Sequence, residues 1–342
     1  MNRFAYARAT TWNEAQALLA DRRFSLPVLK GGGLDLLDMM KEGLIEPDLL
    51  IDVRRAEPAQ GDPPGVMVTP PDLDQPDRRN LGFDARLTLA QVAESPQIRE
   101  FAPVLAQAAE SAATPQVRNV ATVAGNLLQR PRCWYFRHDE FDCLKKGGST
   151  CFAVDGENQH HAIFGGGPCH IVHPSNLACA LHVLNALVSL HGQPAAAIPI
   201  GELYHLPGVG VRTEHDLPTG RMIEGIGCMA VPTSGFYAIK HKQSFDWPIV
   251  MAAVALELEG GRITAARVCA GAVAPIPWPL PHVARALVGV DVTDNAAITR
   301  ACSLASQGAT PMSQNAYKVR LLPVAVERAV LKALGRLPEE LA

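Results

Sequence analysis

Residues 26–53 have the sequence LPVLKGGGLDLLDMMKEGLIEPDLLIDV, and this stretch decides how the N-terminal part of the chain folds. An apolar burst, Leu26–Leu29, leads into a lysine and three glycines. Apolar residues then recur at helical spacing between Leu34 and Leu44, and the segment Asp48–Val53 is typical of a short strand. The pattern predicts a strand, a glycine loop, a helix and a second strand, which together make a βαβ unit.

The glycine loop, residues 31–33, has two interpretations. Its backbone N–H groups can point into one concavity at the N-terminus of the following helix, and a pyrophosphate fits such a nest. Alternatively, the glycines only allow a tight turn. The loop is neither G-x-G-x-x-G nor a Walker A motif, because position 36 is leucine and no Gly-Lys-Ser/Thr follows. Residues 122–126, TVAGN, are a second candidate phosphate loop, for which a turn at a strand end is the alternative.

The rest of the chain divides into segments of different character. The N-terminal two thirds are expected to contain a helix capped by Thr11, one strand within the proline-rich residues 54–80, a helical region from Leu87 to Ala113, a β-branched stretch from Val117 to Gln129 broken at Gly125, and a helix capped by Ser175. Residues 130–174 have no sustained periodicity, which is uncommon unless such a loop has a function or a staple. Beyond residue 220, four alternating segments (222–229, 236–242, 250–258 and 262–270) and three helical patterns (281–288, 293–306 and 315–335) predict a C-terminal α+β domain.

The composition excludes several classes of protein. The chain has 342 residues, of which 48% are hydrophobic and 19% charged, so it is too apolar for a disordered protein and long enough for about two or three domains. Its net charge of −3 argues against a broad face for nucleic acid. The longest apolar run, Ile249–Leu256, is too short to span a bilayer, and the N-terminus has no apolar region typical of a secretory signal.

Four of the eight cysteines, namely Cys133, Cys143, Cys151 and Cys169, lie within residues 130–174. Four thiolates suit either tetrahedral zinc or a [4Fe–4S] cluster. The gaps of 9, 7 and 17 residues lack the short knuckles of structural zinc sites and favour a loop around a larger inorganic core; four unrelated thiols are the remaining alternative. The other four, Cys179, Cys228, Cys269 and Cys302, lie in apolar contexts and are expected to be ordinary buried thiols.

The chain contains, in this order, LKGGGLDLLDMM, RNVATVAGNLL, HPSNLACAL, FYAIKHKQ, GAVAPIPW and SQNAYKVRLLPVAVERAVL. Over about residues 3–335 these stretches resemble the FAD-binding medium subunit of the molybdenum hydroxylases, the family of xanthine dehydrogenase and CO dehydrogenase flavoproteins. The insertion between Gln129 and Ser175 resembles the branch with periplasmic aldehyde oxidoreductase and 4-hydroxybenzoyl-CoA reductase, whose flavin subunits carry a [4Fe–4S] cluster in this loop. The aldehyde oxidoreductase type is more similar around the cysteines.

The resemblance implies an α+β fold with two subdomains that clasp FAD, at residues 1–58 and 59–220, and a C-terminal α+β domain with an antiparallel sheet and helices at residues 221–342. It assigns the four loop cysteines as cluster ligands and assigns no residue as a catalytic acid or base. Alone, Lys240 would be interpreted as a solvated strand residue, but the resemblance places it near the flavin. The FAD contacts that it implies are Leu29, Lys30, Gly31, Gly32, Gly33, Leu34, Asp35, Leu36, Thr122, Gly125, Asn126, Asn176, Ile223 and Lys240.

The implied function is electron transfer within a multi-subunit molybdenum oxidoreductase that oxidises aldehydes. A molybdopterin-binding large subunit and a [2Fe–2S] small subunit would complete a heterotrimer or its dimer, and electrons would pass through the [2Fe–2S] clusters to FAD and an external acceptor. The alternatives are a 4-hydroxybenzoyl-CoA reductase type, with inward electron flow, a xanthine dehydrogenase type and, in a different class, a zinc-stapled scaffold without turnover. The chain itself is expected in the cytoplasm, or in the periplasm if a partner carries a twin-arginine signal.

The absence of a further dinucleotide fingerprint from the sequence predicts poor use of NAD⁺ as electron acceptor. We expect the purified complex to turn over faster with a ferredoxin, a quinone-like dye or O₂ than with NAD⁺. Steady-state rates with each acceptor test this, and NAD⁺ reduction as fast as that of the best artificial acceptor would contradict it.

Overall fold

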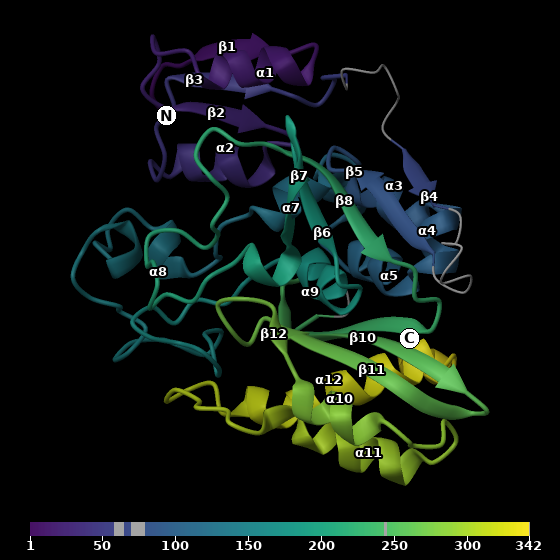
Figure 1. Cartoon of the computed structure of the whole chain (residues 1–342). Helices are drawn as coiled ribbons and strands as arrows, with labels where there is room; N and C mark the ends of the chain where they lie inside the picture. The colour runs from purple at the N-terminus through teal and green to yellow at the C-terminus, as the bar shows by residue number, and fades with distance from the viewer. Residues whose placement is uncertain (58–64, 70–78, 243–244, 342) are drawn as a thin grey trace.

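The structure, a computed structural model, describes residues 1–57, 65–69, 79–242 and 245–341 (Figure 1). Its N-terminal sheet has the strand order β1–β3–β2 and is parallel throughout. The predicted βαβ unit is confirmed, since Leu29 of β2 pairs with Ile51 of β3 on the far side of α2 in the sequence. The elements of this unit are β1 (Ala5–Arg8), α1 (Trp12–Leu19), β2 (Pro27–Lys30), α2 (Leu34–Lys41) and β3 (Leu49–Asp52).

The middle sheet is antiparallel and has the strand order β4–β5–β8–β6–β7. Its strands are β4 (Val66–Val68), β5 (Asn80–Asp84), β6 (Leu187–Leu190), β7 (Gln193–Pro199) and β8 (Ile223–Met229). The α-helices of this part are α3 (Leu89–Glu94), α4 (Pro96–Phe101), α5 (Pro103–Glu110), α6 (Pro115–Arg118), α7 (Val123–Leu127), α8 (Trp134–Arg137) and α9 (Asn176–Val183), with 3₁₀ turns η1 (Leu144–Lys146) and η2 (Ile200–Glu202). The strand expected within residues 54–80 is β4; residues 58–64 and 70–78 of that stretch lie outside the described residues.

Strand β8 does not lie in the C-terminal sheet, where the alternation of residues 222–229 places it in the sequence analysis. It pairs with β5 on one side and β6 on the other. The middle unit therefore extends past the boundary expected at residues 220–221. Alternation identifies a half-buried strand but carries no information about which strands it will pair with.

The helical character expected from Leu87 to Ala113 is confirmed, although the region is divided, and one other local expectation is wrong. The helical region from Leu87 to Ala113 is three helices, because Pro96 and Pro103 each occupy the first turn of a new one. The stretch from Val117 to Gln129 contains helices α6 and α7 in place of β structure. Threonine hydroxyls explain the second difference: Thr114 and Thr122 each accept a hydrogen bond from the backbone three residues later and so cap these short helices.

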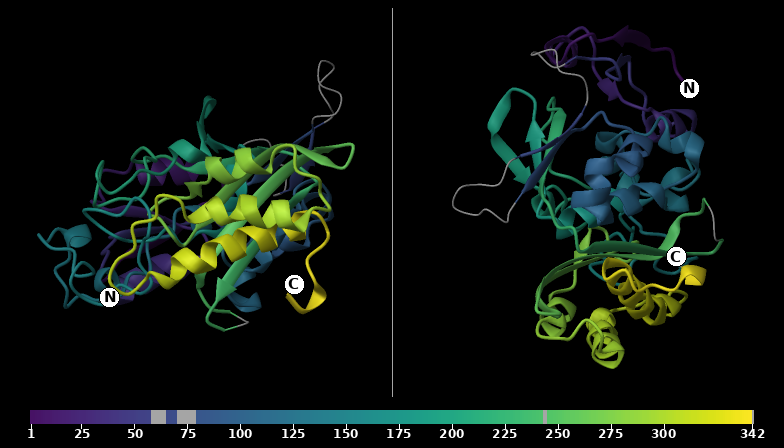
Figure 2. Two further views of the ribbon diagram at one scale, coloured as in Figure 1. Left: turned by 90° about the horizontal axis from the view of Figure 1, so that it is seen from below. Right: turned by 90° about the vertical axis from the view of Figure 1, so that its right-hand side faces the viewer.

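The C-terminal sheet is antiparallel, has the strand order β12–β11–β10–β9, and is covered on one face by helices α10–α12 (Figure 2). On β10, Val250 and Val254 pack toward these helices, whereas Met251 and Ala253 join the core of the middle unit. Burial on both faces explains why β10 is one apolar run. The elements are β9 (Ser234–Lys240), β10 (Pro248–Glu259), β11 (Arg262–Gly271), β12 (Trp278–Pro279), α10 (Pro281–Leu287), α11 (Asn295–Ser303), α12 (Tyr317–Ala333) and the 3₁₀ turns η3 (Leu304–Ser306) and η4 (Glu339–Leu341).

No helix among the described residues combines the length and the apolar character that crossing a bilayer requires.

The contact between β9 and α12 depends on a glycine. A Cβ at Gly235 would lie 2.5 Å from the carbonyl oxygen of Ala329 and 2.6 Å from the backbone nitrogen of Ala333. We therefore expect Gly235→Ala to destabilise the fold by about 1–3 kcal/mol, because neither backbone can move without displacing the helix. Gly227→Ala in β8 is the matched control, since nothing lies within 4 Å of its Cβ position. Equal thermal midpoints for the two variants would contradict this account of the packing.

Candidate functional site

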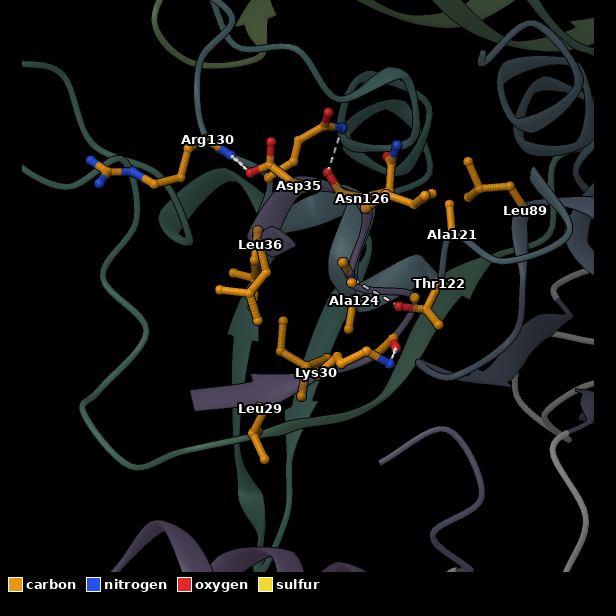
Figure 3. Close-up of a pocket in the computed structure, with 18 of the residues that line it drawn as sticks. Leu29, Lys30, Asp35, Leu36, Leu89, Ala121, Thr122, Ala124, Asn126 and Arg130 are labelled. Carbon is orange, nitrogen blue, oxygen red and sulfur yellow. Dashed lines mark hydrogen bonds between the residues drawn. The ribbon is translucent and has the colours of Figure 1, made fainter. Parts of the chain in front are cut away.

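The first glycine loop joins β2 to α2. Gly33 is the N-cap of α2 and has φ of +78°, a left-handed conformation that glycine adopts without strain. The loop therefore presents backbone N–H groups at the positive end of a helix, an arrangement that favours anions. Asp35 lies in the first turn of α2. Its carboxylate accepts a hydrogen bond of 2.9 Å from the backbone N–H of Arg130 (Figure 3).

The second loop, residues 122–126, and Val120 and Ala121 before it lie against the first. The hydroxyl of Thr122 accepts a hydrogen bond of 3.1 Å from the backbone of Gly125. Glycine is required where the two loops meet: a Cβ at Gly32 would lie 2.3 Å from the carbonyl oxygen of Val120, and one at Gly31 would lie 2.9 Å from Oγ1 of Thr122. The absence of side chains at these two positions thus lets the loops approach each other.

A cavity of about 790 Å³ opens beside the two loops (Figure 3). Its volume lies within the range of small-molecule and cofactor sites. The structure brings together, in its lining, all of the predicted FAD contacts except one: Leu29, Lys30, Gly31, Gly32, Gly33, Leu34, Asp35, Leu36, Thr122, Gly125, Asn126, Asn176 and Ile223.

The exception is Lys240, at the end of β9. Its ammonium donates a hydrogen bond of 2.6 Å to the backbone carbonyl of Ser111, and Ser111 itself lines the cavity. Burial lowers the pKa of Lys240, and the nearby Arg118 acts in the same direction. Lys240 therefore lies one residue behind the cavity wall.

Two polar residues connect the second loop to helix α9. Ser175 caps α9, and its hydroxyl also donates a hydrogen bond of 2.6 Å to the side-chain oxygen of Asn126. Asn176 follows in the first turn, is buried, and donates a hydrogen bond of 3.4 Å to the carbonyl of Ala108. The start and the end of the cysteine-containing segment are thus joined directly beside the cavity.

Sequence reasoning did not identify the arginines of the cavity wall. Arg54, Arg86, Arg130, Arg132 and Arg221 all line it. Arg54 is anchored by Asp52 and Arg86 by Asp84, with shortest nitrogen–oxygen distances of 2.8 Å and 2.6 Å. The sequence could have indicated two of them, Arg54 and Arg130, because they closely follow β3 and α7, whose neighbouring residues line the cavity. The other positions depend on tertiary contacts.

The four cysteines of the 130–174 segment gather around one small pocket. Cys133, Cys143, Cys151 and Cys169 all line it, together with aromatic and aliphatic residues that include Phe136 and Ile171. The pocket volume is about 10 Å³, roughly one water molecule. Within the described residues, no three histidine, cysteine or acidic side chains stand close enough to hold a metal ion. The four thiols thus line one pocket, whose volume in this structure is smaller than a cluster would need.

The surroundings of these thiols are dry and partly cationic. Burial raises the pKa of Cys133 to about 11. A hydrogen bond with Cys151 and burial raise the pKa of Cys169, and the ammonium of Lys145 acts in the opposite direction. His161 places Nε2 3.3 Å from the sulfur of Cys133, and burial lowers its pKa to about 4, which keeps the ring neutral.

The remaining cysteines lie elsewhere, as expected. All are buried in apolar cores, with exposed fractions of 4% or less. Cys179 and Cys269 both point their sulfurs toward the carbonyl oxygen of Ala270 at 3.6 Å. None of the four lines the small pocket, and so they are separate from the thiol group described above: Cys179, Cys228, Cys269 and Cys302.

Ion pairs attach the cysteine segment to α2. Arg137, buried just beyond Cys133, contacts Asp35 at 2.6 Å and Asp38 at 3.2 Å. Arg132 adds a contact of 3.0 Å to Asp38. Because α2 begins with the first glycine loop, a displacement of the cysteine segment would be transmitted to the cavity wall.

Hydrogen bonds attach the same segment to the C-terminal unit. The ammonium of Lys318 on α12 donates to the carbonyls of His160, His161 and Ala272 at 2.8–3.1 Å. Asn315 adds hydrogen bonds to the carbonyls of His161 and Ala162. These hydrogen bonds hold residues 160–162, which belong to no helix or strand, against the C-terminal unit.

Comparison with known proteins gives the same division of the chain. The family described as FAD binding domain in molybdopterin dehydrogenase matches residues 2–227, and the CO dehydrogenase flavoprotein C-terminal domain matches residues 235–333. The first match ends within β8, and the second begins within β9. The resemblance inferred from the sequence motifs is therefore confirmed.

Individual proteins show the same similarity. The aldehyde oxidoreductase FAD-binding subunit PaoB of Escherichia coli (strain K12) is 31% identical over 286 residues, which are 81% of this chain and 84% of that protein. Two solved structures share the fold at 20% identity with a TM-score of 0.71, each covering 98% of this chain and 99% of the other: CO dehydrogenase from Oligotropha carboxidovorans and quinoline 2-oxidoreductase from Pseudomonas putida 86.

The close approach of the two loops predicts the effect of one substitution. Gly32→Val should lower the FAD content of the purified protein well below one per chain, because its Cβ would strike the Val120 carbonyl before any side chain reached the cavity. Gly208→Val is the control, since Gly208 is exposed and nothing lies within 4 Å of its Cβ position. Extraction and chromatography of the flavin measure the result; full FAD content in the Gly32 variant would contradict the proposed role of the loops.

Proposed function

Since this chain belongs to the family of FAD-binding subunits of the molybdenum hydroxylases, we propose that it is the FAD- and [4Fe–4S]-containing electron-transfer subunit of an aldehyde-oxidising enzyme. The observation that carries this proposal is the cavity lined by both loops, together with the pocket that the four thiols line. The chain is an oxidoreductase flavoprotein subunit, and its family is one of FAD-binding proteins.

The cavity residues suit FAD. The N–H groups of Gly31–Gly33 and the N-terminus of α2 would receive one part of the pyrophosphate, and Thr122 to Gly125 the other. Asn176 offers a buried hydrogen-bonding amide, and Ile223 an apolar surface for the ring system. Lys240 would act from behind the wall, through the Ser111 carbonyl that it holds. When bound, FAD supplies hydride and electron transfer, and these residues supply its position and its electrostatic surroundings.

The four converging cysteines suit a [4Fe–4S] cluster by their chemistry. Thiolates are the usual ligands of such clusters, and the pocket is lined by rings and aliphatic side chains that exclude water. The cluster would supply one-electron transfer. The residues of the segment would hold it through the ties of Arg137 to Asp35 and of Lys318 to the carbonyls of His160 and His161.

The partners and the substrate extend this proposal. PaoB is named as a subunit of an aldehyde oxidoreductase, which favours aldehydes as the substrate here. A molybdopterin-binding large subunit would oxidise the substrate, and a [2Fe–2S] small subunit would pass the electrons to this chain. Purification of the native complex followed by assays with aldehydes, purines and aryl-CoA thioesters tests the proposal. Turnover of aryl-CoA thioesters or purines, without activity on aldehydes, would refute the aldehyde assignment.

Serine substitution at each of the eight cysteines tests the cluster. We expect iron to be lost from variants at Cys133, Cys143, Cys151 and Cys169, because each removes one of the thiols that line the pocket. Variants at the other four positions should keep their iron. Metal analysis of anaerobically purified complexes measures this, and iron that survives Cys143→Ser, or zinc in place of iron in the native protein, would overturn the assignment.

The same variants test the link between the two sites. Since Arg137 and Asp35 join the cysteine segment to α2, loss of a ligand should also lower FAD content. Full FAD content in a variant without iron would leave the cluster assignment standing and contradict only this coupling.

A further inference from the structure

A buried ion cluster lies between the cysteine pocket and the FAD cavity. The carboxylate of Glu214 stands 2.6 Å from the ammonium of Lys145 and 3.0 Å from a guanidinium nitrogen of Arg130. A second contact of 3.1 Å joins Arg130 to the other carboxylate oxygen. The side chains of Lys145 and Glu214 are only 2% and 6% exposed.

The two cations that contact Glu214 belong to different sites. Lys145 lines the cysteine pocket and lies two residues after Cys143. Arg130 lines the FAD cavity, and its backbone N–H donates to Asp35 on α2. One carboxylate therefore connects the charged side chains at the edges of both sites.

The two cations keep the carboxylate of Glu214 in its charged form. Burial alone would raise the pKa of Glu214, but the hydrogen bonds and charges of Arg130 and Lys145 lower it below its ordinary value. Lys145 also donates to the carbonyl of Val211 at 2.7 Å, which fixes the position of its ammonium. The group thus combines two positive charges with one negative charge in a dry environment.

Stability alone does not account for such a group. A buried ion pair adds little stability compared with apolar side chains of the same size, because its charges must be taken out of water. A cation beside an iron–sulfur site has a direct electrostatic effect: it favours the more negative, reduced cluster and so raises the reduction potential.

We propose that Lys145 is a positioning residue that raises the reduction potential of the [4Fe–4S] cluster, and that Glu214 fixes its ammonium at the pocket and moderates its effect. This inference rests on the proposed function, because it requires the cluster. Arg130 contacts the same carboxylate. Glu214 therefore neutralises part of the positive charge both near the [4Fe–4S] cluster and at the FAD cavity.

The test is a potentiometric titration of the purified native complex with dithionite, which delivers one electron to each cluster, followed by electron paramagnetic resonance at low temperature. Lys145→Gln should shift the midpoint potential of the [4Fe–4S] signal to a lower value, since a positive charge is lost. Glu214→Gln should shift it to a higher value, since the lysine charge is no longer balanced. Opposite shifts distinguish an electrostatic role from simple disruption, which would move both variants in the same direction.

Two further variants complete the experiment. Lys146→Gln is the matched control, because the ammonium of Lys146 lies at the carbonyl of His138 and is more exposed; its potential should equal that of the wild type. Lys145→Arg keeps the charge and should keep the potential. If Lys145→Gln loses its iron, recovery of iron at the wild-type potential in Lys145→Arg supports the proposal, and loss of iron in both overturns it.

The outcomes separate this inference from the function on which it rests. A wild-type complex without a [4Fe–4S] signal overturns both. A wild-type complex with the signal, but with unchanged potentials in the Lys145→Gln and Glu214→Gln variants or with shifts in one direction, overturns this inference and leaves the proposed function intact. Iron and FAD content, measured on each variant, show that the titrated proteins are equally loaded.

Discussion

The contact between the backbone at Gly32 and the carbonyl of Val120 is the constraint on which the site depends. With only 2.3 Å between that oxygen and a Cβ at position 32, no side chain fits, and the two loops meet backbone to backbone. The meeting aligns the N-terminus of α2, from the parallel sheet, with the turn that begins α7, from the middle unit. Two units that share no sheet are therefore joined at the wall of one cavity, and residues of both loops line it (Figure 3).

The contacts that hold the cysteine segment beside this cavity wall also stabilise its conformation. Side-chain contacts with three neighbouring elements hold the segment. Arg137 of the segment contacts α2, Glu214 from the stretch before β8 contacts Lys145, and Lys318 of α12 donates to the carbonyl of His160. Such ties are costly to break singly, because each leaves a buried charge or carbonyl without its partner. This arrangement holds the four cysteines of the segment at a fixed position relative to the cavity, as the proposed cluster would require.

Local patterns predicted the parts of the fold that are governed by local rules. The apolar burst before three glycines, the apolar repeat after them and the segment Asp48–Val53 were sufficient for β2, α2 and β3, and the alternating segment 250–258 was sufficient for β10. The same rules failed for residues 117–129, where β-branched residues suggested strand but threonine caps produced two short helices. The cavity arginines and the pairing of β8 could not be predicted either, because they depend on which distant elements meet. Motif resemblance, and not periodicity, located Asn176 and Ile223 at the cavity.

The central claim is that the two glycine-containing loops jointly receive the pyrophosphate of FAD. An experimental structure of the chain in its native, flavin-loaded complex tests this most directly. The account predicts density for the pyrophosphate in the cavity, within hydrogen-bonding distance of the backbones of both Gly31–Gly33 and Thr122–Gly125, with the ring system extending toward Ile223. Flavin bound outside this cavity, or a pyrophosphate that contacts only one of the two loops, would contradict it.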